Sequence, residues 1–250
     1  MLGRGAMGAF ALALLYPLAG IVAPIGAWQW GPDVAGSSLA SAWTSLSLTG
    51  LAMAIVVAIG TPVARYLSRA AAVERVVWQA VLLVSILLPP LALGILLALA
   101  FGPHEPAGII AQRVGIRTSN SAVAFVFTQV YVSIGYYVLA AMAAFDAVPR
   151  ALEDQAALLG SDPRRVFFRV TFPLARLGLA VALGLAWVRA LGEFGAVVVT
   201  AYYPAGMPVQ LWTNLQSFGL PAVMPLLLIF LVAALPLPWL ALVLAGRRRV

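Results

Sequence analysis

The chain has 250 residues, of which 63% are hydrophobic and 9% are charged, and its mean hydropathy is +1.02. Such a composition excludes a soluble globular protein. All 15 basic residues are arginines that mostly flank apolar runs, so the net charge of +7 indicates membrane topology and not nucleic-acid binding. The sequence has no cysteine for disulfides or thiol chemistry and no lysine for a P-loop, so any ATPase is expected to be a separate subunit.

Six apolar segments are long enough to cross a bilayer, which takes about 18 to 20 residues. They cover residues 7–28, 43–67, 76–101, 121–144, 174–200 and 220–245. The first also fits a cleavable signal peptide, but it is longer than a usual signal core and more spans follow, so we expect an uncleaved helix. The sequence therefore predicts an all-α membrane protein with six transmembrane helices.

The arginines predict how these spans are oriented. With the N-terminus inside, Arg113 and Arg117 lie outside, Arg189 lies within a span, and twelve arginines lie on the inner side: Arg4, Arg65, Arg69, Arg75, Arg150, Arg164, Arg165, Arg169, Arg176, Arg247, Arg248 and Arg249. This bias places both termini in the cytoplasm. We expect a first helix and outer loop over residues 1–42, one membrane domain over 43–245, and a basic cytoplasmic tail over 246–250.

The third span carries two adjacent prolines, Pro89 and Pro90, near its middle. Because neither can donate a backbone hydrogen bond, the helix should break or kink there. A helix that restarts inside the membrane presents the partial positive charge of its N-terminus, which transporters use to face anions. The alternative is a packing kink without a ligand role, and both interpretations stay open.

The fifth span contains two charged residues, Arg189 and Glu193, with Phe194 beside them. The two charges are one helical turn apart and can pair directly. Charges inside a bilayer are costly and usually face a bundle interior or a cavity. We therefore place these three residues, with Pro89 and Pro90, at a translocation pathway or its gate. The alternative is a structural ion pair that locks this helix to its neighbours.

The connecting segments carry no cluster typical of a catalytic or metal site. His104, the only histidine, lies in the expected loop at residues 102–120, and Glu193 is the only carboxylate within a span. Because an intramembrane enzyme needs convergent acids, bases or nucleophiles, we expect no catalytic residues and no metal ligands. Residues 201–218 are uncharged and fit an interfacial or re-entrant outer loop, or a surface that docks a receptor.

Residues 146–173 form a polar stretch between the fourth and fifth spans, and it holds eight charged residues. Good helix formers precede Gly160, which can adopt the left-handed conformation that stops a helix. Ser161 or Asp162 then caps a second short helix, and Pro173 is expected to end it. A helical hairpin outside the bilayer indicates contact with another protein.

This stretch resembles the EAA loop of permease subunits of type I ABC importers, whose pattern is E-A-A-x3-G-x9-I-x-L-P. Aligned on Gly160, the chain has Asp154, Gln155 and Ala156 at the first three positions and Pro173 at the last. Glu153, one position early, is a candidate for the family's glutamate. In that family the loop docks in a groove of the ATPase. The resemblance therefore implies an ATPase-coupling role for Glu153, Asp154, Gln155, Ala156, Gly160, Asp162, Arg164, Arg165 and Pro173.

Two further segments, LLPPLALG in the third span and RALGEFGA in the fifth, are similar to the molybdate, tungstate and sulfate branch of this family. The resemblance covers residues 43–199 and implies import of such an oxyanion across a bacterial or archaeal cytoplasmic membrane. Related branches carry ferric iron, thiamine, phosphonates, polyamines or phosphate, and these remain alternatives. A transporter or channel that runs without ATP is the remaining one, although it has no reason to carry the hairpin.

The resemblance also implies the partners. Two cytoplasmic ATPase subunits would hold ATP and Mg²⁺, and a substrate-binding protein would dock from outside. A second permease, either an identical copy or a related chain, would complete the solute pathway in the bilayer. This chain itself is expected to bind no cofactor and to hydrolyse no ATP.

Overall fold

The computed structural model describes residues 2–22 and 25–246, so the arginines of the expected tail, Arg247 to Arg249, lie outside the described residues. Within those ranges every regular element is helical, which confirms the all-α prediction. The α-helices are α1 (Leu2–Val22), α2 (Pro32–Leu67), α3 (Ala72–Leu87), α4 (Pro90–Phe101), α5 (Pro106–Arg113), α6 (Ala122–Asp146), α7 (Arg150–Leu158), α8 (Pro163–Val166), α9 (Phe172–Leu191), α10 (Gly195–Thr200), α11 (Met207–Phe218), α12 (Leu220–Ala234) and α13 (Pro236–Gly246). A 3-10 turn, η1 (Ile25–Ala27), follows α1, and a π-helical turn, η2 (Phe167–Thr171), joins α8 to α9.

Four helical segments are long and apolar enough to cross a membrane: Pro32–Leu67, Ala122–Asp146, Pro163–Leu191 and Leu220–Ala241. Together α3 and α4 make a fifth candidate, bent by 107°. The first predicted span is occupied by α1, whose apolar part, Ala6–Gly20, is shorter. The protein is thus a multi-pass membrane protein, and the break predicted at Pro89 and Pro90 is confirmed.

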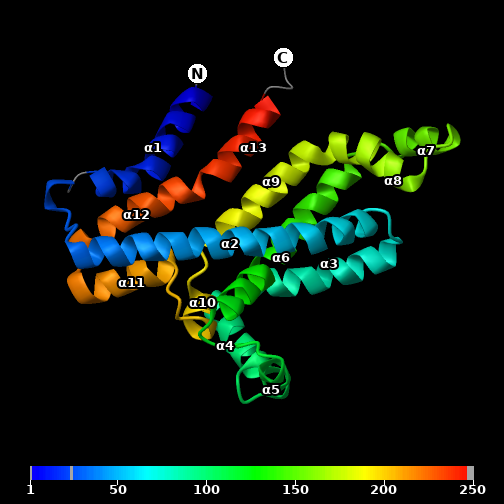
Figure 1. Cartoon of the computed structure of the whole chain (residues 1–250). Coiled ribbons are helices and arrows are strands. Elements are labelled where there is room, and N and C mark those ends of the chain that lie inside the picture. Colours follow the sequence, from blue (N-terminus) through cyan, green and yellow to red (C-terminus); the bar gives the residue numbers. More distant parts are fainter. Residues whose placement is uncertain (1, 23–24, 247–250) are drawn as a thin grey trace.

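The core is formed by α2, α6 and α9, with α6 packed against both of the others (Figure 1). Small side chains line these contacts, and Ala52, Ala141 and Ala182 are all 0% exposed. In lipid, helices associate through close packing rather than through the hydrophobic effect, and alanine lets two backbones approach. These three helices are therefore the framework to which the other elements attach.

Several elements differ from the sequence expectations at their ends. Helix α2 begins at Pro32, within the expected outer loop, because Pro32 and Asp33 suit a first helical turn. The fifth span was expected to be continuous, but it breaks between Leu191 and Gly195. Much of the expected outer loop at residues 201–218 is helix α11. The last span is divided into α12 and α13, where a proline begins the second helix.

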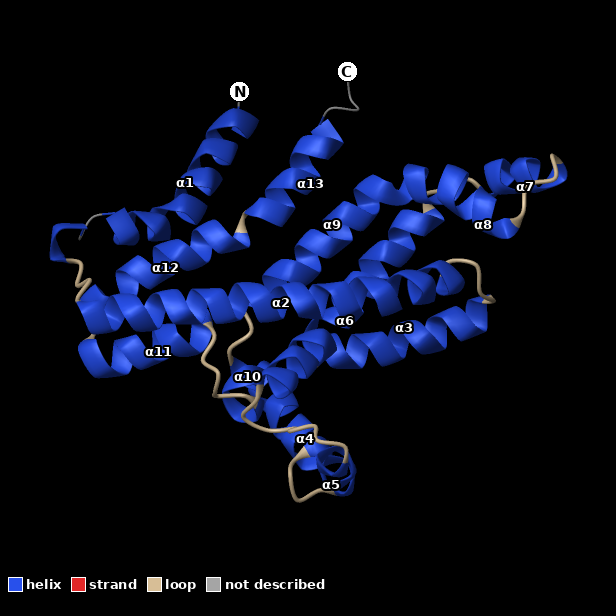
Figure 2. Cartoon of the chain, in the orientation of Figure 1, coloured by secondary structure: helices blue, strands red, loops and turns tan. Residues whose placement is uncertain are grey.

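The hairpin made by α7 and α8, residues 150–166, projects from the end of the molecule where α6 connects to α9 (Figure 1). The turn between α2 and α3 lies at the same end, whereas α5 lies at a different end, beyond α4 (Figure 2). The arginine distribution predicts that the α7–α8 hairpin is cytoplasmic and that α5 is outside.

Candidate coupling face and membrane gate

The turn of the α7–α8 hairpin is closed by backbone hydrogen bonds. The amide of Ser161 donates to the carbonyl of Ala156 at 3.1 Å, and the amide of Gly160 donates to the carbonyl of Ala157 at 2.9 Å. This is the Schellman pattern, which requires a left-handed residue after the last helical turn. Gly160 supplies that residue with a φ of +79°, as the sequence predicts.

Asp162 caps α8, because its carboxylate accepts a hydrogen bond of 2.9 Å from the amide of Arg165. Of the two capping candidates, Ser161 and Asp162, the structure therefore selects Asp162. The expectation that Pro173 ends this second helix is wrong. Helix α8 continues through η2 into α9, and Pro173 lies in the first turn of α9. The wide π-helical turn before it accommodates the missing proline N–H.

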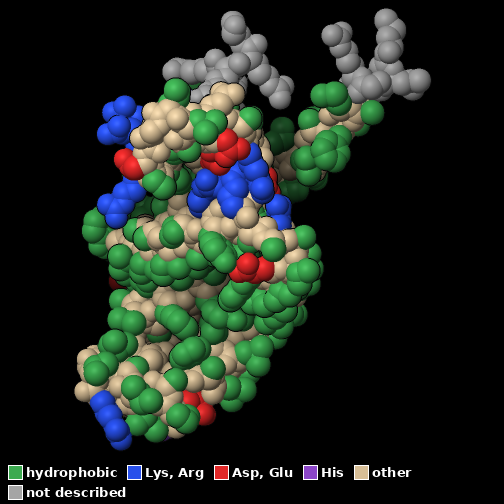
Figure 3. Space-filling model, turned by 90° about the vertical axis from the view of Figure 1, so that its right-hand side faces the viewer, with side chains coloured by type: hydrophobic (Ala, Val, Ile, Leu, Met, Phe, Trp, Pro, Cys, Tyr) green, Lys and Arg blue, Asp and Glu red, His purple; other side chains and the backbone are tan. Residues whose placement is uncertain are grey.

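The α7–α8 hairpin presents a mixed polar and apolar surface. At its tip, Leu158 and Leu159 are each 87% exposed. Charged side chains of both signs lie close together at this end of the molecule (Figure 3). Ala156 is half-buried, and five other side chains implicated by the resemblance are exposed: Asp154, Gln155, Asp162, Arg164 and Arg165. Large exposed apolar side chains among charges indicate a surface for protein contact.

Glu153 differs from its neighbours on α7, because it is only 9% exposed and turns into the molecule. One carboxylate oxygen accepts hydrogen bonds from Arg65 Nη2 at 3.0 Å and Thr171 Oγ1 at 2.5 Å. The other accepts from Arg69 Nη2 at 2.9 Å and Arg69 Nε at 3.2 Å. We call these four residues the Glu153 clasp. It joins α7 to the end of α2 and to η2, at the base of α9.

The clasp keeps the Glu153 carboxylate ionised. Burial raises the pKa of Glu153, but the Thr171 hydrogen bond and the two arginines together lower it by more, so this pKa lies below the ordinary 4.5. A lowered pKa in the folded state contributes stability that is present above the unfolded value. That contribution is lost only as the pH falls below about 4.5 and through the lower pKa of the folded state.

Within the spans, the start of α4 packs closely against the start of α10. A Cβ atom added to Gly195 would lie 2.8 Å from Pro90 Cβ, and one added to Gly94 would lie 2.8 Å from Ala196 Cα. Only glycine permits such backbone contact at a helix crossing. Because α10 covers the N-terminal turn of α4 here, the geometry favours the packing interpretation of the Pro89 kink.

The Arg189 guanidinium and the Glu193 carboxylate form the ion pair that their spacing predicts. Glu193 is 2% exposed, and its second oxygen accepts a hydrogen bond of 2.6 Å from the amide of Ala196. The guanidinium carbon of Arg189 lies 5.7 Å from the ring centroid of Tyr136 on α6, within cation–π range. The pair thereby ties the last turn of α9 to the first turn of α10 across the break.

Polar side chains of α6 hold both sides of this break. Gln129 Nε2 donates to the carbonyl of Ala190 at 3.1 Å, and the hydroxyls of Thr128 and Thr200 are 2.7 Å apart. In a bilayer, the backbone groups freed by a broken helix need such partners because water is absent. Gln129 and Thr128 are therefore part of the junction.

The predicted gate residues come together at the α9–α10 junction. Phe194 precedes the first turn of α10, and its ring centroid lies 5.9 Å from that of Trp212 on α11. Pro90 reaches the same junction through its contact with Gly195, next to Phe194 in the chain. Apart from Pro173 in the first turn of α9, the predicted site residues thus form two separate groups, one at the α7–α8 hairpin and one inside the spans.

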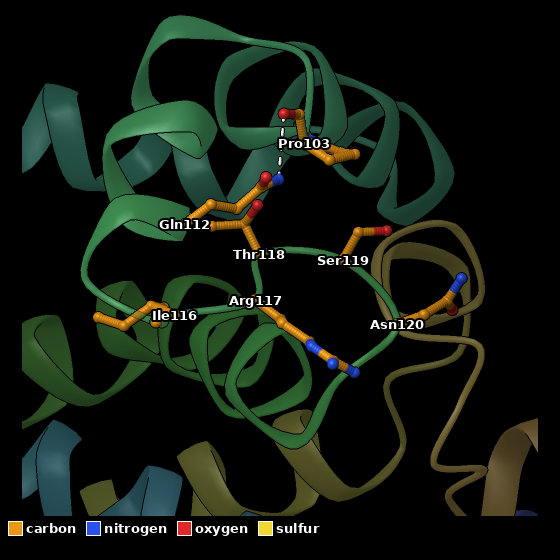
Figure 4. A pocket seen from close by; sticks show the side chains of 8 residues that line it. Pro103, Gln112, Ile116, Arg117, Thr118, Ser119 and Asn120 are labelled. Atoms are coloured by element: carbon orange, nitrogen blue, oxygen red, sulfur yellow. Dashed lines mark hydrogen bonds between the residues drawn. The ribbon is translucent and has the colours of Figure 1, made fainter.

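A polar hollow of about 600 Å³ lies between α5 and the segment that leads into α6 (Figure 4). On its wall, Gln112 Nε2 donates to the carbonyl of Pro103 at 3.1 Å. Asn120, which lines the hollow, is bound to the end of α10, because its backbone N–H donates to the carbonyl of Thr200 at 3.0 Å. The sequence pattern predicted only a loop at residues 102–120, so helix α5 within this segment differs from the expectation.

Residues 57–250 match the family model for the binding-protein-dependent transport system inner membrane component. A probable molybdenum ABC transporter permease protein of Haloferax volcanii is 36% identical over 223 residues, which cover 89% of this chain and 81% of that protein. A molybdenum transport system permease protein of Azotobacter vinelandii is 33% identical over 64% of this chain and 72% of that protein. The fold is similar to a chain of a bacterial alginate ABC transporter in complex with a periplasmic protein, with a TM-score of 0.74, 14% identity, and coverage of 96% of this chain and 91% of that chain.

Proposed function

Because the chain belongs to the family of binding-protein-dependent transport system inner membrane components, we propose that it is the permease subunit of an ATP-driven oxyanion importer. Molybdate is the first candidate substrate, because the two relatives described above are named as molybdenum permeases. Tungstate and sulfate are the alternatives closest in chemistry, since they share the tetrahedral shape and the double negative charge of molybdate.

The α7–α8 hairpin is the observation that carries this proposal. It stands outside the bilayer between two spans, and it exposes Leu158 and Leu159 beside the charged Asp154. An ATPase groove with apolar and charged walls would accept that surface. The surplus of arginines on the same side supports a cytoplasmic hairpin, where ATP is available.

Two copies of the chain, or this chain and a related one, would form the pathway between them. The core of α2, α6 and α9 is packed with apolar side chains, so a single copy is poorly suited to conduct an ion. The broken helices α3–α4 and α9–α10 supply the irregular backbone that membrane proteins tolerate only where protein or a cavity surrounds it. We assign the gate to that junction.

The ion pair between Arg189 and Glu193 bears on how the substrate is recognised. Arg189 is neutralised by Glu193, so its guanidinium is not available as a free anion ligand in this conformation. Selection among oxyanions would then depend chiefly on the extracytoplasmic binding protein. The permease would provide an opening and closing route, driven by ATP-dependent movement of the docked hairpin.

Reconstitution tests this function. The chain would be purified with a candidate ATPase and a candidate substrate-binding protein and placed in liposomes with radiolabelled molybdate. We expect uptake that needs both ATP and the binding protein, and competition by tungstate and sulfate would rank the substrates. Uptake that proceeds without ATP, or failure of any ATP-hydrolysing chain to co-purify, would contradict the proposal.

A further inference from the structure

We infer that Glu153 is a positioning residue that makes the α7–α8 hairpin move as one body with α2 and α9, so that movement of a docked ATPase reaches both spans. This inference rests on the proposed coupling to an ATPase. In this inference Glu153 binds residues of its own chain, whereas the sequence resemblance implies a direct contact of Glu153 with the ATPase.

The covalent connections of α7 do not explain a link to α2. Along the chain, α7 follows α6 after a short turn and reaches α9 only through the exposed Gly160 turn and α8. The Glu153 clasp supplies the missing connection, since Arg65 lies in the last turn of α2 and Arg69 lies two residues after its end. Longer contacts lie along the same edge: Arg69 Nη2 is 3.4 Å from the carbonyl of Val148, and Arg150 Nη2 is 3.5 Å from that of Ser68.

Glu153 has little capacity left to bind a partner. An ionised carboxylate offers about four acceptor positions. Arg65, Thr171 and two nitrogens of Arg69 already occupy them. The next residue, Asp154, is exposed on the hairpin and is the carboxylate that an ATPase would meet. Adjacent acidic residues therefore take different tasks, with Asp154 facing outward and Glu153 facing the spans.

Thr171 of the Glu153 clasp lies at the π-helical turn, where the segment from α8 to α9 bends most easily. Thr171 is 0% exposed and is the last residue of η2, the π-helical turn through which α8 continues into α9. Such turns interrupt the regular hydrogen-bond ladder and are frequent points of kinking. By holding Thr171, Glu153 stops the hairpin from swinging at η2 without moving α9.

The test measures transport and ATP hydrolysis separately in reconstituted complexes. We expect the Glu153→Ala complex to keep its ATPase subunits, with basal ATP hydrolysis within about twofold of the unmodified complex. Uptake per ATP hydrolysed should fall by about tenfold or more, which is within the usual range of coupling effects. Because this change leaves two arginines without their partner, Thr171→Val serves as a milder second variant. It removes one hydrogen bond at nearly constant shape, and uptake per ATP should fall in the same direction by a smaller factor.

A matched control comes from the other ion pair at this end of the molecule. Arg75 and Asp146 pair at 2.5 Å between α3 and α6, with side chains 34% and 29% exposed. Asp146→Asn should leave uptake per ATP unchanged, since exposed pairs contribute little. Unchanged uptake per ATP in Glu153→Ala would overturn the inference. So would loss of the ATPase from Glu153→Ala but not from Asp154→Ala, because Glu153 would then be a docking contact.

A second measurement does not depend on transport. The chain has no cysteine, so spin labels can be attached to single cysteines at Tyr66 on α2 and Leu158 on α7, which are 60% and 87% exposed. We expect a narrow distance distribution that broadens in Glu153→Ala, without any ATPase present. If it broadens while the unmodified chain shows no ATP-driven uptake, the proposed function fails and the clasp stands. A distribution that does not broaden contradicts the clasp itself.

Discussion

Arg189→Met should destabilise the folded protein by about 3–5 kcal/mol and abolish transport, because it removes one partner of a buried ion pair. Glu193 would keep the Ala196 amide, at 2.6 Å, as a hydrogen-bond donor but would lose its counter-charge. With Glu193 only 2% exposed, water cannot replace that charge. Thermal unfolding in detergent measures the stability, and uptake into liposomes measures the transport.

The double variant Arg189→Met with Glu193→Gln is the control for this prediction. It removes the stranded charge and keeps an oxygen that can accept from the Ala196 amide, so most of the lost stability should return. A double variant that folds and transports indicates a structural pair, whereas one that folds without transporting indicates a direct role in the pathway. A double variant as unstable as Arg189→Met would contradict the ion-pair account.

Gly160→Val should uncouple ATP hydrolysis from uptake. Gly160 has a φ of +79°, which costs an ordinary L-residue about 1–2 kcal/mol and a β-branched residue more. The Schellman turn would open, and α7 and α8 would no longer present Leu158 and Asp154 in a fixed arrangement. We expect ATP hydrolysis to persist while uptake falls to background, as measured on the same liposomes.

The local conformation, and not the loss of space, is the reason for this expectation. A Cβ atom at Gly160 would meet nothing within 4 Å. Asparagine tolerates the left-handed region, so Gly160→Asn should keep most of the uptake. If Gly160→Asn and Gly160→Val were equally defective, backbone strain would not be the cause, and a direct contact of this turn with the ATPase would have to replace it.

The spans and the hairpin could be predicted because their signals are local. Hydropathy identified each apolar segment, and the Pro89–Pro90 pair predicted the bend between α3 and α4. Gly160 predicted the turn, and Ser161 or Asp162 predicted the second helix cap, since such residues act through backbone geometry within a few residues. The pairing of Arg189 with Glu193 followed from helical spacing alone.

The break between α9 and α10 was missed because the apolar pattern continues across it. Two glycines, Gly192 and Gly195, flank the break in LGEFG, but glycines within a span are equally typical of close helix contacts. Gly195 makes such a contact with Pro90, and Glu193 between the two glycines accepts a hydrogen bond from the Ala196 amide in the first turn of α10. The prediction that Pro173 ends a helix was wrong because a proline is also favoured in the first turn of a helix, and Pro173 occupies that position in α9.

The inward position of Glu153 depends on tertiary contacts that no local pattern shows. Its partners Arg65 and Arg69 are distant in sequence and looked like ordinary topology signals at the end of a span. On the sequence, Glu153 and Asp154 were therefore equivalent candidates for contact with the ATPase. Only the salt bridges of Glu153 with Arg65 and Arg69 and its hydrogen bond from Thr171 distinguish it from Asp154.

Coupling to an ATPase requires that the tip of the α7–α8 hairpin lies in the cytoplasm and contacts the ATPase. Leu158→Cys would be the only cysteine in the chain, at a side chain that is 87% exposed. In membrane vesicles of known sidedness, we predict labelling by an impermeant maleimide from the cytoplasmic side only. We also predict that the Leu158→Cys variant can be cross-linked to the ATPase subunit and that bound ATPase blocks the labelling. Labelling from the outer side, or undiminished labelling in the presence of the ATPase, would contradict the account.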